Sequence, residues 1–196
     1  MAARYWVGGS GTWSTTSTTN WSATSGGAGG ASVPTAADSV FFDQAGTYTV
    51  TMTGALTCLD ITVSAGTVTF ATGTTPTLAI SGSMSLLAGT VWSSTVAITF
   101  NATTTGKTVT TNGTTISGQI TFFGTGGWTL GSALNCQSSI SIIQGTFDTS
   151  STGNYTVTAS SLALNTTITR TVNLNASTVS LTEQGRVLLT RQRLLA

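Results

Sequence analysis

Residues 61–68 read ITVSAGTV, and this short stretch decides what fold the chain is expected to have. Its apolar and polar residues alternate, so Ile61 and Val63 face one side of an extended strand while Thr and Ser face the other. A Gly-Thr pair follows, and Val68 and Phe70 then resume the alternation. Gly66 suits a sharp corner because glycine tolerates positive φ. The stretch therefore predicts two short strands joined by a tight turn.

The same pattern returns along the chain. Residues 84–91 read MSLLAGTV, residues 140–147 read ISIIQGTF, and residues 120–125 give a looser copy, ITFFGT. A second motif, GTYTVT at 46–51, returns as GNYTVT at 153–158. Gly66 and Gly89 are 23 residues apart, which is compatible with coils of about 20–30 residues. Units this short cannot bury their own apolar face and must stack on their neighbours.

We therefore predict an all-β fold, a parallel β-helix (β-solenoid) with an apolar interior and a Thr/Ser exterior. Roughly six coils at the ~4.8 Å strand spacing would give a rod about 30 Å long. A β-sandwich is the alternative, because it also consists of short strands separated by frequent turns.

The composition fits this prediction. The chain has 196 residues, of which only 6% are charged, and Thr is the commonest residue. Gly occurs 23 times and Pro twice, which indicates many strands with glycine turns and not a flexible linker. The net charge of +1 gives no reason to expect a nucleic-acid partner. No stretch approaches the ~20 apolar residues that span a bilayer, so we expect no membrane insertion.

Three segments differ in character. Residues 1–45 form a Trp/Gly-rich N-terminal cap or attachment segment, residues 46–182 the solenoid body, and residues 183–196 a basic and apolar C-terminal arm. Trp6, Trp13 and Trp21 lie in a Gly/Ser/Thr matrix. Their rings could cover the open end of the solenoid core, which we favour, or form a platform that binds a partner.

The C-terminal arm differs in composition from the Thr- and Ser-rich body. It could be a short amphipathic helix, an extended strand, a frayed terminus or an anchor that docks on a partner subunit. Its candidate partner-contacting residues are Arg186, Arg191, Arg193, Leu194 and Leu195.

The chain offers little material for catalysis. It has no His, so no Ser-His-Asp or Cys-His arrangement can be built. A solenoid could bring Asp60 and Asp148 together as a glycosidase pair, but acids are so scarce that we expect no enzyme. Asp38 and Asp43 are expected to cap turns and not to bind calcium, and we expect no cofactor. The five acids are Asp38, Asp43, Asp60, Asp148 and Glu183.

The two cysteines, Cys58 and Cys136, lie far apart in sequence. We expect two free, buried thiols that pack as small apolar side chains. A disulfide could form only if the fold brings the two residues close together.

Several stretches near the N-terminus carry a resemblance. They are YWVGGSGTW at 5–13, NWS at 20–22, VPTAADSVFFD at 33–43 and YTV at 48–50. Together they resemble the start of β-solenoid proteins in bacteriophage structural modules and in bacterial autotransporter-passenger adhesins. The resemblance implies a β-helix on a virion surface or a bacterial cell surface. Because phage decorations and fibres are commonly trimeric, it also implies a homotrimer.

The leading functional hypothesis is a non-enzymatic bacteriophage virion protein, either a capsid decoration (cement) protein or a fibre segment. Its partners would be other virion subunits and, for a fibre, a host-surface glycan. The opening residues have no apolar h-region of signal-peptide length, and this favours the phage interpretation. One alternative is a secreted surface adhesin that binds glycans through its Trp cluster. The other is an ice-binding solenoid that uses Thr-x-Thr triplets such as Thr47 and Thr49.

Overall fold

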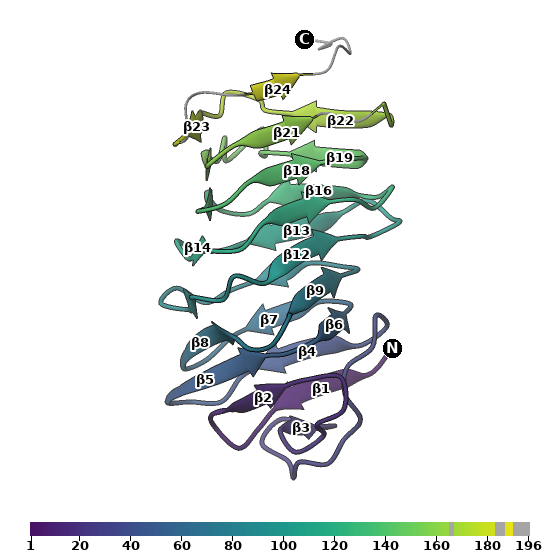
Figure 1. Ribbon diagram of the computed structural model, residues 1–196, viewed down its shortest axis with the longest axis vertical. Coiled ribbons are helices and arrows are strands. Elements are labelled where there is room, and N and C mark those ends of the chain that lie inside the picture. The colour runs from purple at the N-terminus through teal and green to yellow at the C-terminus, as the bar shows by residue number, and fades with distance from the viewer. Residues whose placement is uncertain (165–166, 183–186, 190–196) are drawn as a thin grey trace.

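The chain folds into a three-faced parallel β-solenoid, seen from the side in the computed structural model (Figure 1). The structure describes residues 1–164, 167–182 and the strand 187–189, and these contain strands and turns but no helix. The predicted β-solenoid is therefore confirmed, and the β-sandwich alternative is wrong.

The first face is a nine-stranded sheet and the third face a seven-stranded sheet. In spatial order, the first face consists of β22 (Arg170–Asn173), β19 (Gly145–Asp148), β16 (Gly127–Leu130), β13 (Lys107–Thr110), β10 (Met84–Ser85), β7 (Ile61–Val63), β4 (Ser39–Phe42), β1 (Ala3–Trp6) and β3 (Trp21–Ser22). The third face consists of β24 (Val187–Leu189), β21 (Leu162–Leu164), β18 (Ile140–Ile142), β15 (Ile120–Phe122), β12 (Ala97–Phe100), β9 (Thr77–Ile80) and β6 (Ala55–Cys58).

The second face is split into two four-stranded sheets. The lower sheet holds β11 (Val91–Trp92), β8 (Thr67–Thr72), β5 (Thr47–Met52) and β2 (Gly11–Trp13). The upper sheet holds β14 (Thr115–Ile116), β17 (Leu134–Cys136), β20 (Val157–Ala159) and β23 (Val179–Leu181). Side chains bridge the two sheets, since the hydroxyl of Thr114 donates to the carbonyl of Thr90 at 3.1 Å and that of Ser117 to the carbonyl of Trp92 at 2.9 Å.

Each coil visits the three faces in turn. The path from β4 through β5 and β6 to β7 makes one coil, and six complete coils run from β4 to β21 before β22, β23 and β24 continue the stack. Val40 pairs with Ile61, and Ile61 pairs with Met84, so consecutive coils take 21 and 23 residues. These periods lie within the predicted range.

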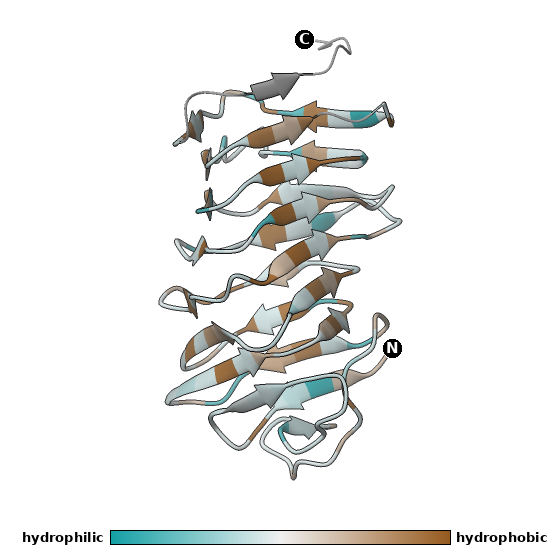
Figure 2. Cartoon of the chain, viewed as in Figure 1, coloured by the Kyte–Doolittle hydropathy of each residue, from teal (hydrophilic) through white to brown (hydrophobic). Residues whose placement is uncertain are grey.

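The inward-facing residues are those that the alternation predicted. Ile61, Val63, Val68 and Phe70 are all buried. In Figure 2 the brown, hydrophobic bands recur on strand after strand along the stack. Because every coil contributes its inner row to one continuous cluster, the core runs the length of the solenoid body.

Two groups of aromatic rings fill much of this core. The lower group has neighbouring ring centroids 4.5–6.1 Å apart, and the upper group 4.9–6.0 Å apart, both within the usual range for aromatic pairs. The lower group consists of Trp6, Trp13, Trp21, Phe42, Phe70 and Trp92, and the upper group of Phe100, Phe122, Trp128 and Phe147.

The repeated sequence motif marks two different corners of the solenoid, and at each corner two of its copies begin on paired strands of successive coils. The copy at 61–68 joins the first face to the second, whereas the copies at 120–125 and 140–147 join the third face to the first. Even between the first two copies the register differs from the sequence match. Val91 pairs with Thr69 and not with Val68, so Val91 is 46% exposed, and Trp92 takes the inner place above Phe70.

Glycine at the corners allows the coils to approach closely. A Cβ on Gly118 would lie 1.9 Å from the carbonyl oxygen of Val96 in the coil beneath, and one on Gly124 would lie 2.0 Å from that of Ala102. Gly66 also has φ +72°, as its predicted corner role requires. The close spacing of the loops thus depends on positions that have no side chain.

Candidate functional site

The three N-terminal indoles lie inside the cap. Trp6, Trp13 and Trp21 are each at most 1% exposed, and their rings pack edge to face with centroids 5.1 and 5.3 Å apart. The short strand β3 pairs antiparallel with β1 and places Trp21 opposite Trp6. Since the rings are covered on all sides, they present no face on which a ligand could stack.

Asp38 fastens the chain that covers this end. Its carboxylate accepts hydrogen bonds from the backbone amide of Ala2 at 3.0 Å, and from the amide and hydroxyl of Thr35 at 3.1 and 2.7 Å. Burial alone would raise the pKa of Asp38, but the Thr35 and Ala2 hydrogen bonds, together with the nearby charge of Arg4, hold the pKa below its usual value. The turn-capping role predicted for Asp38 is confirmed.

Asp60 and Asp148 do not form a carboxylate pair. Asp60 precedes β7 and Asp148 ends β19, four strands further along the first face, so they lie about 19 Å apart along the axis. Asp60 links coils, since it accepts from the hydroxyl of Ser39 at 2.8 Å and the amide of Ser83 at 2.7 Å. The carboxylates therefore serve as acceptors between coils, and no acid–base pair of the glycosidase type forms here.

The carboxylate of Asp148 is also used as a hydrogen-bond acceptor. Its carboxylate accepts from the amide of Ser150 at 2.6 Å and from the side-chain amides of Asn173 and Asn175 at 3.1 and 2.9 Å. Across the described part of the chain, no group of three or more His, Cys, Asp or Glu residues could hold a metal ion.

Both cysteines are free and buried, as the sequence led us to expect. Cys58 lies on β6 of the third face and Cys136 on β17 of the second face. Burial raises the pKa of both thiols, and the charge of Asp60 adds to the effect at Cys58. Neither thiol is therefore suited to act as a nucleophile at neutral pH.

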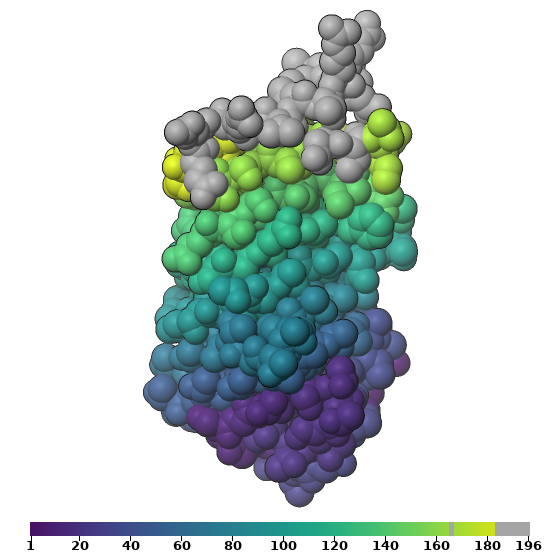
Figure 3. All heavy atoms as spheres, in the orientation of Figure 1, coloured from purple at the N-terminus to yellow at the C-terminus, as the bar shows by residue number. Residues whose placement is uncertain are grey.

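The outward side of the third face is built from small, uncharged residues. One column of directly stacked positions crosses six coils and contains no side chain larger than threonine. The space-filling view shows the coils stacked as successive colour bands into one elongated body (Figure 3). The column consists of Thr57, Ala79, Thr99, Thr121, Ser141 and Ala163.

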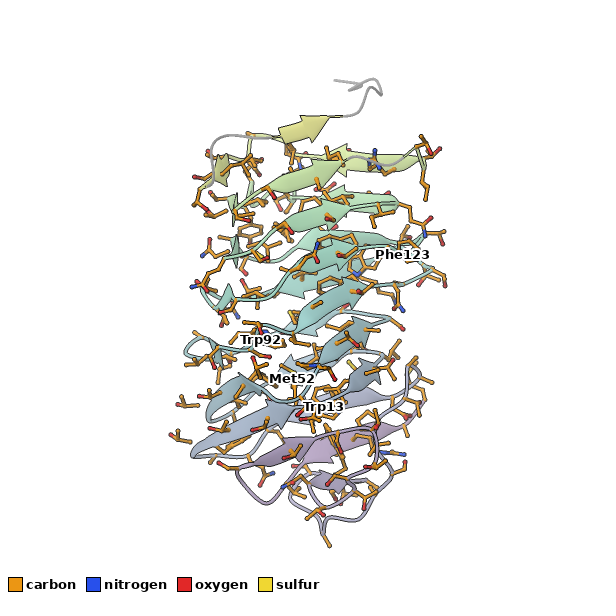
Figure 4. The ribbon with its side chains drawn as sticks, in the orientation of Figure 1. Trp13, Met52, Trp92 and Phe123 are labelled. Atoms are coloured by element: carbon orange, nitrogen blue, oxygen red, sulfur yellow. The ribbon has the colours of Figure 1, made fainter. Side chains whose placement is uncertain are left out.

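The corner between the third and first faces carries the most distinctive surface feature. An open hollow of about 230 Å³ spans the loops of three successive coils there. Phe123 directly follows β15 and is 48% exposed (Figure 4), and its carbonyl accepts a hydrogen bond from the side chain of Gln144, which lines the hollow. The residues that line the hollow are Thr125, Gln144, Gly145, Thr146, Thr169, Arg170 and Thr171.

Sequence reasoning did not single out these residues, although one signal was present. In Ile120-Thr121-Phe122-Phe123 the second phenylalanine breaks the alternation, because it falls on an outward position. A large apolar residue at an outward position next to a glycine-rich loop is the kind of exception that marks an exposed contact.

The other predicted contact residues lie outside the described part of the chain. They are Arg186, Arg191, Arg193, Leu194 and Leu195. Of the arm, the structure describes strand β24, which extends the third face by pairing with β21. None of the described residues form a helix long and apolar enough to cross a membrane.

The chain matches no known protein family, no curated protein and no solved structure.

Proposed function

We propose that this protein is a non-enzymatic structural rod on the surface of a bacteriophage particle, either a capsid decoration protein or a fibre segment. The observation that carries the proposal is the continuous core. Buried residues from Trp6 to Leu162 form one cluster, and a ladder of parallel pairings joins every coil to the next. Such a stack cannot bend at one coil without breaking its ladder, so it holds its two ends at a fixed separation.

The described acidic and thiol side chains support the structure and are not arranged for a reaction. Asp38, Asp60 and Asp148 accept hydrogen bonds that fasten one segment of the backbone to another. Both thiols are buried. The outward column on the third face is flat and uncharged, so neighbouring subunits could pack closely against it.

The two ends of the rod differ in this proposal. The N-terminal end is closed by β3 and the three buried indoles, which suits an end that faces solvent. Attachment to the particle is assigned to the C-terminal arm, whose sequence combines the charged residues Arg191 and Arg193 with the apolar Leu194. Other virion subunits are the partners, and the homotrimer comes from the family resemblance alone.

Truncation of the arm tests this proposal. Deleting residues 190–196 leaves every described strand in place, because β24 ends at Leu189. Particles purified by sedimentation should carry the full-length chain at a fixed stoichiometry, as counted by quantitative mass spectrometry, and should lose the truncated chain. Val91→Ala, an exposed change on the second face, is the matched control and should leave occupancy unchanged. Full-length protein that stays in the soluble fraction would refute the virion role, and full occupancy of the truncated chain would refute the arm as anchor.

The ice-binding alternative gains limited support from the register. Thr47 stacks on Thr67, and Thr49 on Thr69, so the predicted triplets do align on two coils of the second face. The array ends at the next coil, where Val91 stands over Thr69. A thermal-hysteresis measurement at millimolar protein decides this alternative, and the two-coil array leads us to expect no activity.

A further inference from the structure

We propose that the hollow at the corner between the third and first faces binds a saccharide ring. The inference goes beyond the proposed structural role, because a rod needs no such site, and it assigns the glycan contact to a place other than the buried tryptophans. Thr125 and Gln144 form its lower side, while Thr169 and Arg170 belong to the coil above.

Glycine at this corner lets the loops that carry the hollow approach one another closely. Gly145 lies directly beneath Arg170 in the register, and a Cβ on Gly145 would lie 2.4 Å from the carbonyl oxygen of Gly124 and 2.5 Å from that of Gly126. The amide of Gly126 in turn donates to the carbonyl of Ala102 at 2.8 Å, and that of Thr146 to Gly126 at 2.9 Å. These bonds and the pairing of Gly145 with Arg170 join the coils that carry the hollow, so its walls are held in place before any ligand arrives.

The lining offers polar groups of the kind that sugar hydroxyls need. Thr125, Thr146 and Thr171 contribute hydroxyls, which can each donate and accept a hydrogen bond. The side-chain nitrogen of Gln144 donates to the carbonyl of Phe123, which fixes the carboxamide and leaves its oxygen as an acceptor at the rim.

Arg170 is held at the upper side of the hollow. Its guanidinium donates to the carbonyl of Ile143 at 3.2 Å and to that of Leu164 at 2.7 Å. These bonds fix the orientation of the planar guanidinium, so this side of the hollow carries a positive charge in a defined position.

Two exposed apolar residues lie close in sequence to residues of the lining. Phe123 is 48% exposed and stands two residues before Thr125, and Ile168 is 43% exposed and directly precedes Thr169. A pyranose ring has an apolar C–H face and a rim of hydroxyls, so it can lie against the phenyl ring while its hydroxyls reach the lining. A purely apolar ligand would leave the polar groups unpaired, and a polyphosphate would call for more than one cation.

Ligand-detected saturation-transfer NMR tests the inference on the full chain. The probes are maltotriose, lactose, chitotriose and sialyllactose, each offered to the wild type, to Phe123→Ala and to Val91→Ala. Val91 is the matched control, because it is a similarly exposed apolar residue on a different face. Thermal unfolding of each variant confirms that the fold is intact.

Wild type and Val91→Ala should show transfer to at least one probe, concentrated on its C–H protons, while Phe123→Ala should bind that probe about tenfold more weakly. Absence of transfer to all four probes, or an equal loss in both variants, would overturn the proposal. Neither result bears on whether the chain is found in particles, so the structural role stands or falls separately.

Discussion

Phe122 and Phe123 are neighbours in the sequence but face opposite sides of the solenoid wall, so replacing each by alanine should have very different consequences. Phe122 is fully buried, with ring centroids 5.0 Å from Phe100, 4.9 Å from Phe147 and 5.4 Å from Trp128. Removing this ring leaves a cavity at the centre of the upper aromatic group, and truncations of this kind cost about 3–5 kcal/mol. Phe123 is 48% exposed, so its truncation should cost less than about 1 kcal/mol.

Urea denaturation followed by Trp fluorescence measures the difference. With an m-value of about 2 kcal/mol/M, the Phe122→Ala midpoint should fall by about 2 M, while that of Phe123→Ala should shift by less than about 0.5 M. Because stacked coils can unfold in stages, hydrogen exchange at β12, β15 and β18 should be followed as well, and it should accelerate only in Phe122→Ala. Equal losses in the two variants would refute the orientation of β15 on which both the core and the saccharide site depend.

Three further outcomes are expected. Gly118→Ala should destabilise the protein more than Gly89→Ala in thermal melts, because a Cβ at Gly118 would clash with backbone, whereas Gly89 has open space and only its φ of +90° to strain. The lowered pKa of Asp38 means that its stabilising contribution is present above the unfolded-state value of 3.8 and is lost as the pH falls through the folded-state value. Asp38→Asn should therefore lower the melting temperature at about pH 7, and by progressively less as the pH falls below 3.8. Cys58 and Cys136 should not react with a thiol reagent in the native protein at neutral pH, and both should react in denaturant, since burial raises both pKa values.

The fold could be predicted from the sequence because a solenoid core has a simple requirement. Every coil must turn an apolar row inward, so the alternation at Ile61, Val63 and Val68 is sufficient to define the strands and their inner side. The glycine between the strands then predicts the corner, as the φ of +72° at Gly66 shows.

The register could not be predicted in the same way. The matching letters at 61–68 and 84–91 align Val68 with Val91, whereas the hydrogen-bonded ladder aligns Thr69 with Val91. A shift of one residue between strands exchanges the inner and outer rows, and this is how Trp92 and not Val91 comes to be buried. Coil-to-coil pairing depends on loop lengths throughout a turn of 20 or more residues, and a local motif does not record them.

The candidate site, too, was only partly predictable from the local sequence. The cap was among the predicted possibilities for Trp6, Trp13 and Trp21, but the surrounding Gly and Ser residues have no alternation that would distinguish a buried ring from an exposed one. The hollow was missed because its lining comes from three loops, around Thr125, Gln144 and Arg170, that approach one another only after the coils have stacked.

Coil stacking also explains why the faces carry so little charge. Each outward residue stands directly above and below its counterparts on neighbouring coils, as Thr99 does between Ala79 and Thr121. Like charges at such positions would repel one another along the whole column, so small residues and threonine are favoured there whether or not a partner is present. The uncharged faces therefore allow close packing with other subunits without requiring it.

The corners are free of this constraint, because their loops vary in length from coil to coil. Larger or polar side chains that contact a ligand can therefore be placed there. The exposed Phe123 and the hollow beside it lie at such a corner.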